Sequence, residues 1–295
     1  MRIATWNVNS LKARLDKVRW WLERAAPDVL LMQETKLSDA DAPTAAFEEL
    51  GYTFAHHGEG RWNGVAIASK LPIAEVCTNF GEPLRPAQTP SAGDDEPLAE
   101  ARMIAGLTGG VRVVSVYVPN GRAVASKFYA AKLAWLARLS RWLEETRSPD
   151  DDLVVGGDFN VAPTDGDVWN PLACNGGTHV SPPEREAFER LRAWGLVDAY
   201  REHHPELERY SWWDYRAGDF YKNVGMRIDH LLVTRRLAER SVAAEIDREA
   251  RKGKPIPSDH APVTVDLDAP GRAFDAGWEG AAERIAARRA KAKKT

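Results

Sequence analysis

Short apolar segments alternate along the chain with segments that repeat apolar residues at helical spacing. Eight of the apolar segments have the length and the β-branched composition of buried strands. We predict strands at residues 3–7, 28–34, 64–69, 101–108, 111–118, 153–158, 228–234 and 261–267. Strands that alternate with helices in this way predict a sheet-rich α/β domain.

Three helices are expected between these strands. The first follows Ser10, a residue suited to an N-cap, and its apolar face consists of Leu11, Leu15, Val18 and Leu22. The second is expected over about residues 123–146, with an apolar stripe of Phe128, Trp135, Leu139 and Trp142. The third begins after Pro182 and Pro183, ends at Gly195 and carries Phe188 and Leu191.

The length of 295 residues admits one large domain or two modest ones. No apolar run is long enough to cross a bilayer, and the N-terminus lacks the apolar core of a signal peptide. The cysteines, Cys77 and Cys174, have no metal-ligand spacing and are expected to be reduced. We therefore expect a soluble, cytoplasmic protein with no membrane partner.

Charge is distributed unevenly along the chain. The formal net charge of −3 does not by itself indicate a nucleic-acid partner, but residues 284–295 are basic. Residues 81–100 include the sequence GDDEP and form the only stretch with the composition of a flexible insertion. The apolar pattern changes after Asp268. We expect one domain over residues 1–268 and a basic, mobile tail over residues 269–295.

Polar residues stand where several predicted strands begin or end. They are Asn7, Glu34, Tyr117, Asn120, Asp158, Asn160, Asp229, Asp259 and His260. Each alone has an ordinary structural explanation: Asn7 would cap a turn, for example, and Tyr117 would be a core aromatic. Together they predict a polar rim at one edge of a sheet, and Gly156 and Gly157 are expected to allow close packing just before Asp158.

Carboxylate and amide oxygens without a cysteine cluster suit a hard cation such as Mg²⁺ or Mn²⁺. A carboxylate that activates water and a histidine that meets a phosphate oxygen are what metal-assisted phosphoester hydrolysis requires. An EF-hand at residues 158–169 is excluded because Ala162, Pro163 and Trp169 occupy key positions of that loop. A serine-hydrolase triad is not supported, because neither Ser10 nor Ser258 lies in a G-x-S-x-G elbow.

Seven segments in order then resemble one known family. They are TWNVNSLKAR, LLMQETKL, WNGVAIASK, VYVPNGR, GGDFNVAPTDGDVW, NVGMRIDHLL and PSDHAPV, between residue 1 and about residue 267. The chain resembles the exonuclease III family of abasic-site endonucleases, part of the endonuclease/exonuclease/phosphatase superfamily. The resemblance implies a four-layer α/β sandwich, in which two packed, mostly antiparallel sheets are flanked by helices, and makes residues 1–268 a catalytic domain.

The resemblance also implies roles for the polar residues. The implied Mg²⁺ ligands, with Mn²⁺ as a substitute, are Glu34 as the principal ligand and Asn7, Asp158, Asn160 and Asp259 around it. Asp158 would activate the attacking water and Asn160 would orient it. His260, held by Asp229, would contact the scissile phosphate, which Tyr117 and Asn120 also reach. An adjacent carboxylate would favour the charged form of this histidine.

By resemblance, Trp212, Met226 and Ile228 wall a pocket for a flipped-out abasic sugar. Met226 stands where some relatives have a bulkier aromatic residue, so a looser pocket is expected. Trp213 is assigned to packing, and the acids Asp165 and Asp167 to structure. Contacts to the DNA backbone are expected from Arg122, Lys127, Lys222, Arg251 and Lys252.

The implied function is a monomeric DNA-repair nuclease that acts on double-stranded DNA with abasic sites or blocked 3′ ends. It would cut 5′ to the abasic site and also act as a 3′–5′ exonuclease and a 3′-end phosphodiesterase or phosphatase. One alternative is another phosphoesterase of the superfamily, acting on undamaged DNA, inositol phosphates or sphingomyelin. A second alternative is a non-catalytic DNA-binding protein, which the retention of every polar side chain argues against.

Overall fold

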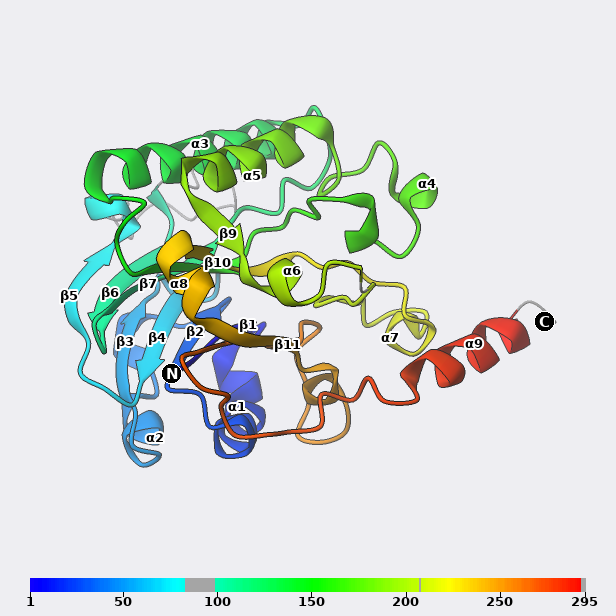
Figure 1. Cartoon of the computed structure of the whole chain (residues 1–295), viewed down its shortest axis with the longest axis horizontal. Coiled ribbons are helices and arrows are strands. Elements are labelled where there is room, and N and C mark those ends of the chain that lie inside the picture. The colour runs from blue at the N-terminus through cyan, green and yellow to red at the C-terminus, as the bar shows by residue number, and fades with distance from the viewer. Residues whose placement is uncertain (83–98, 207, 293–295) are drawn as a thin grey trace.

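The computed structural model describes residues 1–82, 99–206 and 208–292, and its strands form two six-stranded sheets (Figure 1). The first sheet has the order β11-β12-β1-β2-β4-β3. Its strands are β1 (Arg2–Asn7), β2 (Val29–Gln33), β3 (Thr53–His57), β4 (Val65–Ser69), β11 (Ser241–Ile246) and β12 (Val263–Leu267). The second sheet has the order β5-β6-β7-β8-β10-β9. Its strands are β5 (Ala74–Thr78), β6 (Met103–Thr108), β7 (Val111–Tyr117), β8 (Leu153–Asp158), β9 (Leu196–Asp198) and β10 (Asp229–Thr234).

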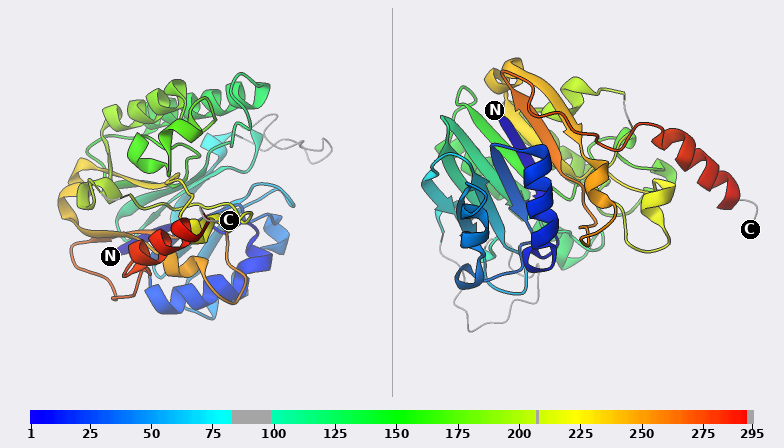
Figure 2. Two further views of the ribbon diagram at one scale, coloured as in Figure 1. Left: turned by 90° about the vertical axis from the view of Figure 1, so that its right-hand side faces the viewer. Right: turned by 90° about the horizontal axis from the view of Figure 1, so that it is seen from below.

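Each sheet contains one parallel pair, β1 with β2 and β7 with β8, and its other pairs are antiparallel. The described helices are α1 (Leu11–Ala25), α2 (Thr44–Glu48), α3 (Lys127–Thr146), α4 (Pro171–Cys174), α5 (Pro182–Trp194), α6 (Ala199–His203), α7 (Asp219–Lys222), α8 (Arg235–Arg240) and α9 (Ala281–Ala292). Helix α1 covers the outer face of the first sheet, and α3 and α5 cover that of the second (Figure 2). The predicted four-layer α/β sandwich is confirmed.

The core lies in three layers between these elements. Leu31 and Ile67 of the first sheet meet Val113 and Leu231 of the second sheet. The sheets approach closely at Gly156, where an added Cβ would lie 2.6 Å from Leu231 and 2.8 Å from Leu31. An added Cβ on the next residue, Gly157, would lie 1.9 Å from the carbonyl oxygen of Val116. The two glycines therefore let β8 run between its neighbours up to Asp158.

Each predicted strand corresponds to a strand of the structure, with ends shifted by at most two residues. The prediction missed β3, β5, β9 and β11, which are half-exposed or very short. Helix α3 starts at Lys127 rather than 123, with Ser126 as N-cap. Phe128 is not in the apolar stripe but is half-exposed under the guanidinium of Arg122, 3.6 Å from its ring centroid. The expected flexible insertion falls almost wholly outside the described residues.

The first part of the expected tail packs against the domain. Arg2 donates a hydrogen bond of 2.6 Å to the carbonyl of Arg272. The indole of Trp278 donates one of 2.7 Å to the carbonyl of Ile246, and Phe274 packs on the layer under α1. Residues 271–281 of the expected tail therefore contact the domain, and the mobility of the tail stays a prediction. None of the described helices has the length and apolar character of a transmembrane span.

Candidate active site

Strand register brings the predicted polar residues to one edge of the sandwich. In the second sheet, Asp158 at the end of β8 pairs with Tyr117 of β7 and with Asp229 of β10. In the first sheet, Asn7 at the end of β1 pairs with the last residue of β2, directly before Glu34. Because these strand ends share an edge, the side chains meet in one place.

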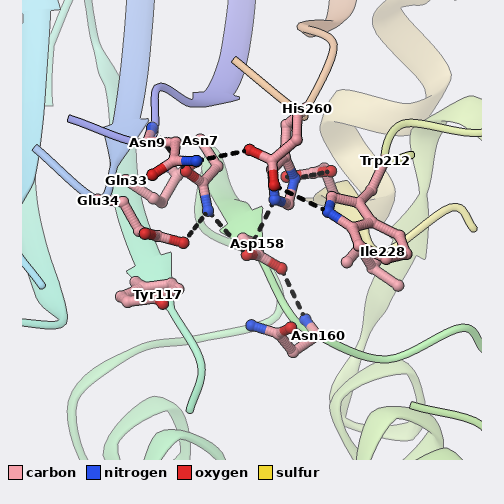
Figure 3. A network of polar contacts seen from close by, with 12 residues as sticks. Asn7, Asn9, Gln33, Glu34, Tyr117, Asp158, Asn160, Trp212, Ile228 and His260 are labelled. Carbon is pink, nitrogen blue, oxygen red and sulfur yellow. Dashed lines mark hydrogen bonds and ion pairs between the residues drawn. The ribbon is translucent and has the colours of Figure 1, made fainter. Parts of the chain in front are cut away.

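Asn7 connects the two carboxylates of the site (Figure 3). Its amide nitrogen donates to Oε1 of Glu34 at 2.8 Å and to Oδ2 of Asp158 at 3.0 Å. The second oxygen of Glu34 lies 2.8 Å from the ammonium of Lys36. Glu34 has a φ of 51°, a left-handed conformation that non-glycine residues rarely adopt. This backbone turn lets the carboxylate face the second sheet.

His260 and Asp229 form a buried ion pair at the floor of the site. Nδ1 of His260 lies 2.9 Å from one oxygen of Asp229 and 3.1 Å from the other. Burial opposes the charged imidazolium, but the charge and hydrogen bonds of Asp229 outweigh it and raise the pKa of His260 to about 10. The histidine is therefore a cation at neutral pH, as the sequence predicted. Its Nε2 lies 3.9 Å from Asp158.

Asp158 titrates near neutrality. Burial is the main cause, and the charges of Asp229 and Glu34 add to it, so that the pKa of Asp158 rises to about 7 although His260 opposes the shift. Oδ1 of Asp158 accepts a hydrogen bond from the backbone N–H of Asn160 at 2.9 Å. A carboxylate with such a pKa can accept a proton at physiological pH.

Asp259 lies beside the cluster of Glu34, Asp158 and His260. Its Oδ1 accepts from the amide of Asn9 at 2.9 Å, and its Oδ2 accepts from the indole of Trp212 at 3.2 Å. Asn9 was not predicted from the sequence. Its position two residues after Asn7, in the same polar loop, is the signal that could have indicated it.

The amides of Asn120 and Asn160 are linked at 3.2 Å, with Asn120 as the donor. A fully buried lysine from α3, Lys132, lies behind them. Its ammonium donates to the carbonyl of Asn160 at 2.6 Å and to that of Asn120 at 3.4 Å, and it pairs with the buried carboxylate of Glu184. The sequence prediction missed this lysine, although a lysine three residues before Trp135 on an apolar helix face is unusual.

These side chains surround a cavity of about 190 Å³. Its lining consists of Glu34, Tyr117, Asn120, Asp158, Asn160, His179, Trp212, Ile228, Asp259 and His260. His179 was not predicted, because no buried strand leads to it. Its Nδ1 donates to the carbonyl of Asn160 at 2.6 Å. Burial, with help from the charge of Lys132, lowers the pKa of His179 to about 4, so the ring is neutral.

Met226, expected to wall the pocket, pairs with Trp212 but does not line this cavity. His179 lines the same cavity as Trp212, and the expectation of a looser pocket stays a prediction. Trp213 is fully buried and packs against Phe220, as predicted.

Arg251 is not an exposed backbone contact, because it is 7% exposed and donates to the carbonyl of Trp213. Asp167 is buried and paired with Arg227, as its structural assignment requires.

The donor set fits a hard cation. Ligand atoms of Glu34, Asp158 and His260 lie within 4.8 Å of one another. Two of these residues are carboxylates, the ligands that Mg²⁺ prefers, whereas the raised pKa of His260 makes it a cation rather than a ligand. Asn7 presents its amide nitrogen to the carboxylates and its oxygen to the N–H of Asn9, so an oxygen ligand from Asn7 requires rotation of the amide.

The four layers and the acidic cavity define an α/β sandwich protein with a carboxylate-based site. The chain belongs to the Endonuclease/Exonuclease/phosphatase family, whose model matches residues 4–260. It is 33% identical to an exodeoxyribonuclease III from Haemophilus influenzae, over 90% of this chain and 100% of that protein. An AP endonuclease structure from Archaeoglobus fulgidus superposes with a TM-score of 0.83 at 36% identity, over 91% of this chain and 100% of that one. A 3′ phosphatase from Neisseria, bound to a product DNA hairpin, gives a TM-score of 0.81 at 38% identity over the same shares of the two chains.

Proposed function

We propose that this protein is a DNA-repair nuclease. It hydrolyses the phosphodiester bond 5′ to abasic sites in duplex DNA, and it removes nucleotides or blocking phosphate groups from 3′ ends. One observation carries the proposal: Asp158, bridged by Asn7 to Glu34, lies 3.9 Å from an imidazole that is paired with Asp229, at a cavity open to a substrate. The similarity to an exodeoxyribonuclease III, an AP endonuclease and a 3′ phosphatase supports DNA as the substrate.

In this proposal Asp158 is the general base. It takes a proton from the attacking water, and its pKa of about 7 matches that task at physiological pH. The backbone N–H of Asn160 holds Oδ1 of this carboxylate at 2.9 Å and the amide of Asn7 holds Oδ2 at 3.0 Å, so the carboxylate is fixed in place and each oxygen keeps a lone pair that can accept from the water. The side chain of Asn160 orients the water beside it.

The negative charge that develops on the phosphate oxygens needs donors around it. The imidazolium of His260 supplies a positive charge, and Asp229 holds its ring in place through Nδ1. Tyr117 and Asn120 line the same cavity and supply neutral donors. Each of these groups is fixed by the protein before the substrate arrives, which lowers the cost of reorganisation.

Glu34 and Asp158 would hold a Mg²⁺ ion, with Asp259, Asn160 and Asn7 near it, and Mn²⁺ would substitute. When bound, the ion supplies Lewis-acid stabilisation of charge on a phosphate oxygen. Asn7 keeps Glu34 and Asp158 close together through its two hydrogen bonds.

The cavity size favours a sugar over a whole nucleotide. Its volume of about 190 Å³ lies below the range of about 300–1,000 Å³ that holds drug-sized ligands. Trp212 and Ile228 provide its apolar wall. A sugar without a base is also the easiest nucleotide to extrude from a duplex. The protein is proposed to act as a monomer.

The test compares substrates for the purified chain with Mg²⁺ and with EDTA. A duplex with one abasic analogue should be nicked 5′ to the lesion only in the presence of the metal. Phosphate should be released from a 3′-phosphate end under the same condition. The same assay is run on undamaged duplex ends, on inositol phosphates and on sphingomyelin. Release of phosphate from a lipid or inositol substrate, without a nick at the abasic site, would refute the proposed function.

A further inference from the structure

We infer that α9 binds the phosphate backbone of duplex DNA beside the candidate active site and so extends the DNA contact beyond the catalytic domain. This inference rests on the proposed function, because the partner is the same duplex. The family model ends at residue 260, so α9 (Ala281–Ala292) lies outside what the family shares.

The charge balance of the chain is the first observation. Residues 269–295 hold seven basic and three acidic residues, a formal charge of +4, so residues 1–268 carry −7 of the total of −3. Helix α9 itself contains Arg284, Arg288, Arg289 and Lys291, with Glu283 as its one acid. Because DNA binding is dominated by neutralised phosphates, a basic helix on an acidic protein complements a polyanion.

The segment before α9 is fixed to the domain, which gives the helix a defined starting point. Phe274 lies under the guanidinium groups of Arg2 and Arg24, each 5.0 Å from its ring centroid. Trp278 packs on the layer between the sheets and bonds to the carbonyl of Ile246. Ala281, the first residue of α9, is 2% exposed. These contacts hold the start of α9 in a defined position on the domain.

Helix α9 is linked to the candidate active site through its neighbour α7. It contacts α7, and α7 follows Trp212 and Trp213 along the chain. A groove between α9 and the domain is lined by Trp169, Asn223 and Ile285. Figures 1 and 2 show α9 extending away from the sheets on the side where α7 lies. The 12 residues of α9 span about 18 Å, or roughly five base pairs of duplex.

Binding of a duplex of about 30 base pairs, measured by fluorescence anisotropy in EDTA over a salt series, tests the inference. The variant is R288Q/R289Q/K291Q. The matched control, R141Q/R190Q/R235Q, removes the same charge from exposed residues of α3, α5 and α8. The slope of log K against log salt should fall by up to about 2.7 in the α9 variant, at roughly 0.9 per lost phosphate contact, and stay unchanged in the control.

Two further measurements localise the effect. On a duplex with one central abasic site, which fixes where the protein binds, shortening from one end, but not from the other, should abolish the difference between the wild-type chain and the α9 variant. Truncation after Gly280 should reproduce the weaker binding while the melting temperature stays close to that of the full chain, because Phe274 and Trp278 remain. Equal losses in variant and control, or an unchanged slope in the α9 variant, would overturn the inference. Since binding is measured without turnover, failure of the proposed cleavage would be seen separately.

Discussion

The amide of Asn7 donates a hydrogen bond to the carboxylate of Asp158 at 3.0 Å, and the two residues end strands of different sheets. The same amide also bonds to Glu34 at 2.8 Å. One side chain thus sets the distance between two carboxylates that would otherwise repel each other. The candidate site is therefore a product of how the two sheets pack.

Replacement of that carboxylate should separate binding from chemistry. Asp158→Asn removes the proposed base but keeps the size of the side chain, so single-turnover cleavage of abasic DNA should fall by at least about a hundredfold. Affinity for uncleaved DNA, measured by anisotropy in EDTA, should stay close to that of the wild-type protein. Asp165→Asn, an exposed acid, is the control and should keep full activity. Near-normal turnover in Asp158→Asn would contradict the role of base.

His260 and Asp229 should behave as one unit. If Asp229 acts only by holding and charging His260, the double variant Asp229→Asn/His260→Gln should lose no more activity than His260→Gln alone. The cleavage rates of the wild-type protein, Asp229→Asn, His260→Gln and the double variant, measured under single-turnover conditions, give the coupling. Losses that simply add would show that Asp229 acts on the substrate independently.

Much of this site could be predicted because its residues stand at the ends of buried strands. Asp158 and Asp229 interrupt strongly apolar runs, and the sheet register then brings them together. Lys132 and His179 approach the same place from a helix and a loop, where no strand pattern points to them. Arg251 shows the opposite error. It was predicted to be a surface contact because it is a basic residue in a polar segment, but its buried guanidinium lies over the rings of Tyr215 and Phe220.

Removal of the His179 ring should change the ratio of abasic-site cleavage to release of a 3′ phosphate. The imidazole lines a cavity of about 190 Å³ together with Trp212 and Ile228, so His179→Ala should enlarge this cavity and admit the abasic sugar more easily. We expect the ratio of cleavage at an internal abasic site to release of a 3′ phosphate to rise. His204→Ala, which removes a partly buried histidine bonded to the carbonyl of Ala244 outside this cavity, is the control. An unchanged ratio would show that His179 does not limit entry.

Lys132 should be needed for both stability and activity. Lys132→Met leaves the carboxylate of Glu184 buried without its partner, and loss of one member of such a pair costs about 3–5 kcal/mol. The second variant, Lys132→Met/Glu184→Gln, removes the unpaired charge and should recover part of the free energy of unfolding in urea titrations. Its cleavage rate should stay low, because the carbonyls of Asn120 and Asn160 still lack the ammonium of Lys132 and keep only the hydrogen bonds from Thr178 and His179. Recovery of both properties together would assign Lys132 to stability alone.

Asp167 should make stability depend on pH in the acid range. Burial opposes its ionisation, but the charges and hydrogen bonds of Arg227 and Arg201 prevail and lower the pKa to about 2, from 3.8 for a free side chain. A lowered pKa stabilises the folded state above about pH 4, by about 2 kcal/mol here, and roughly half of this is lost by pH 3 as the unfolded chain takes up the proton. Asp167→Asn should therefore be less stable than the wild-type protein at pH 7, and the gap should narrow at pH 3. Urea unfolding at the two pH values measures it, and a constant gap would show that the ion pair with Arg227 does not produce the lowered pKa.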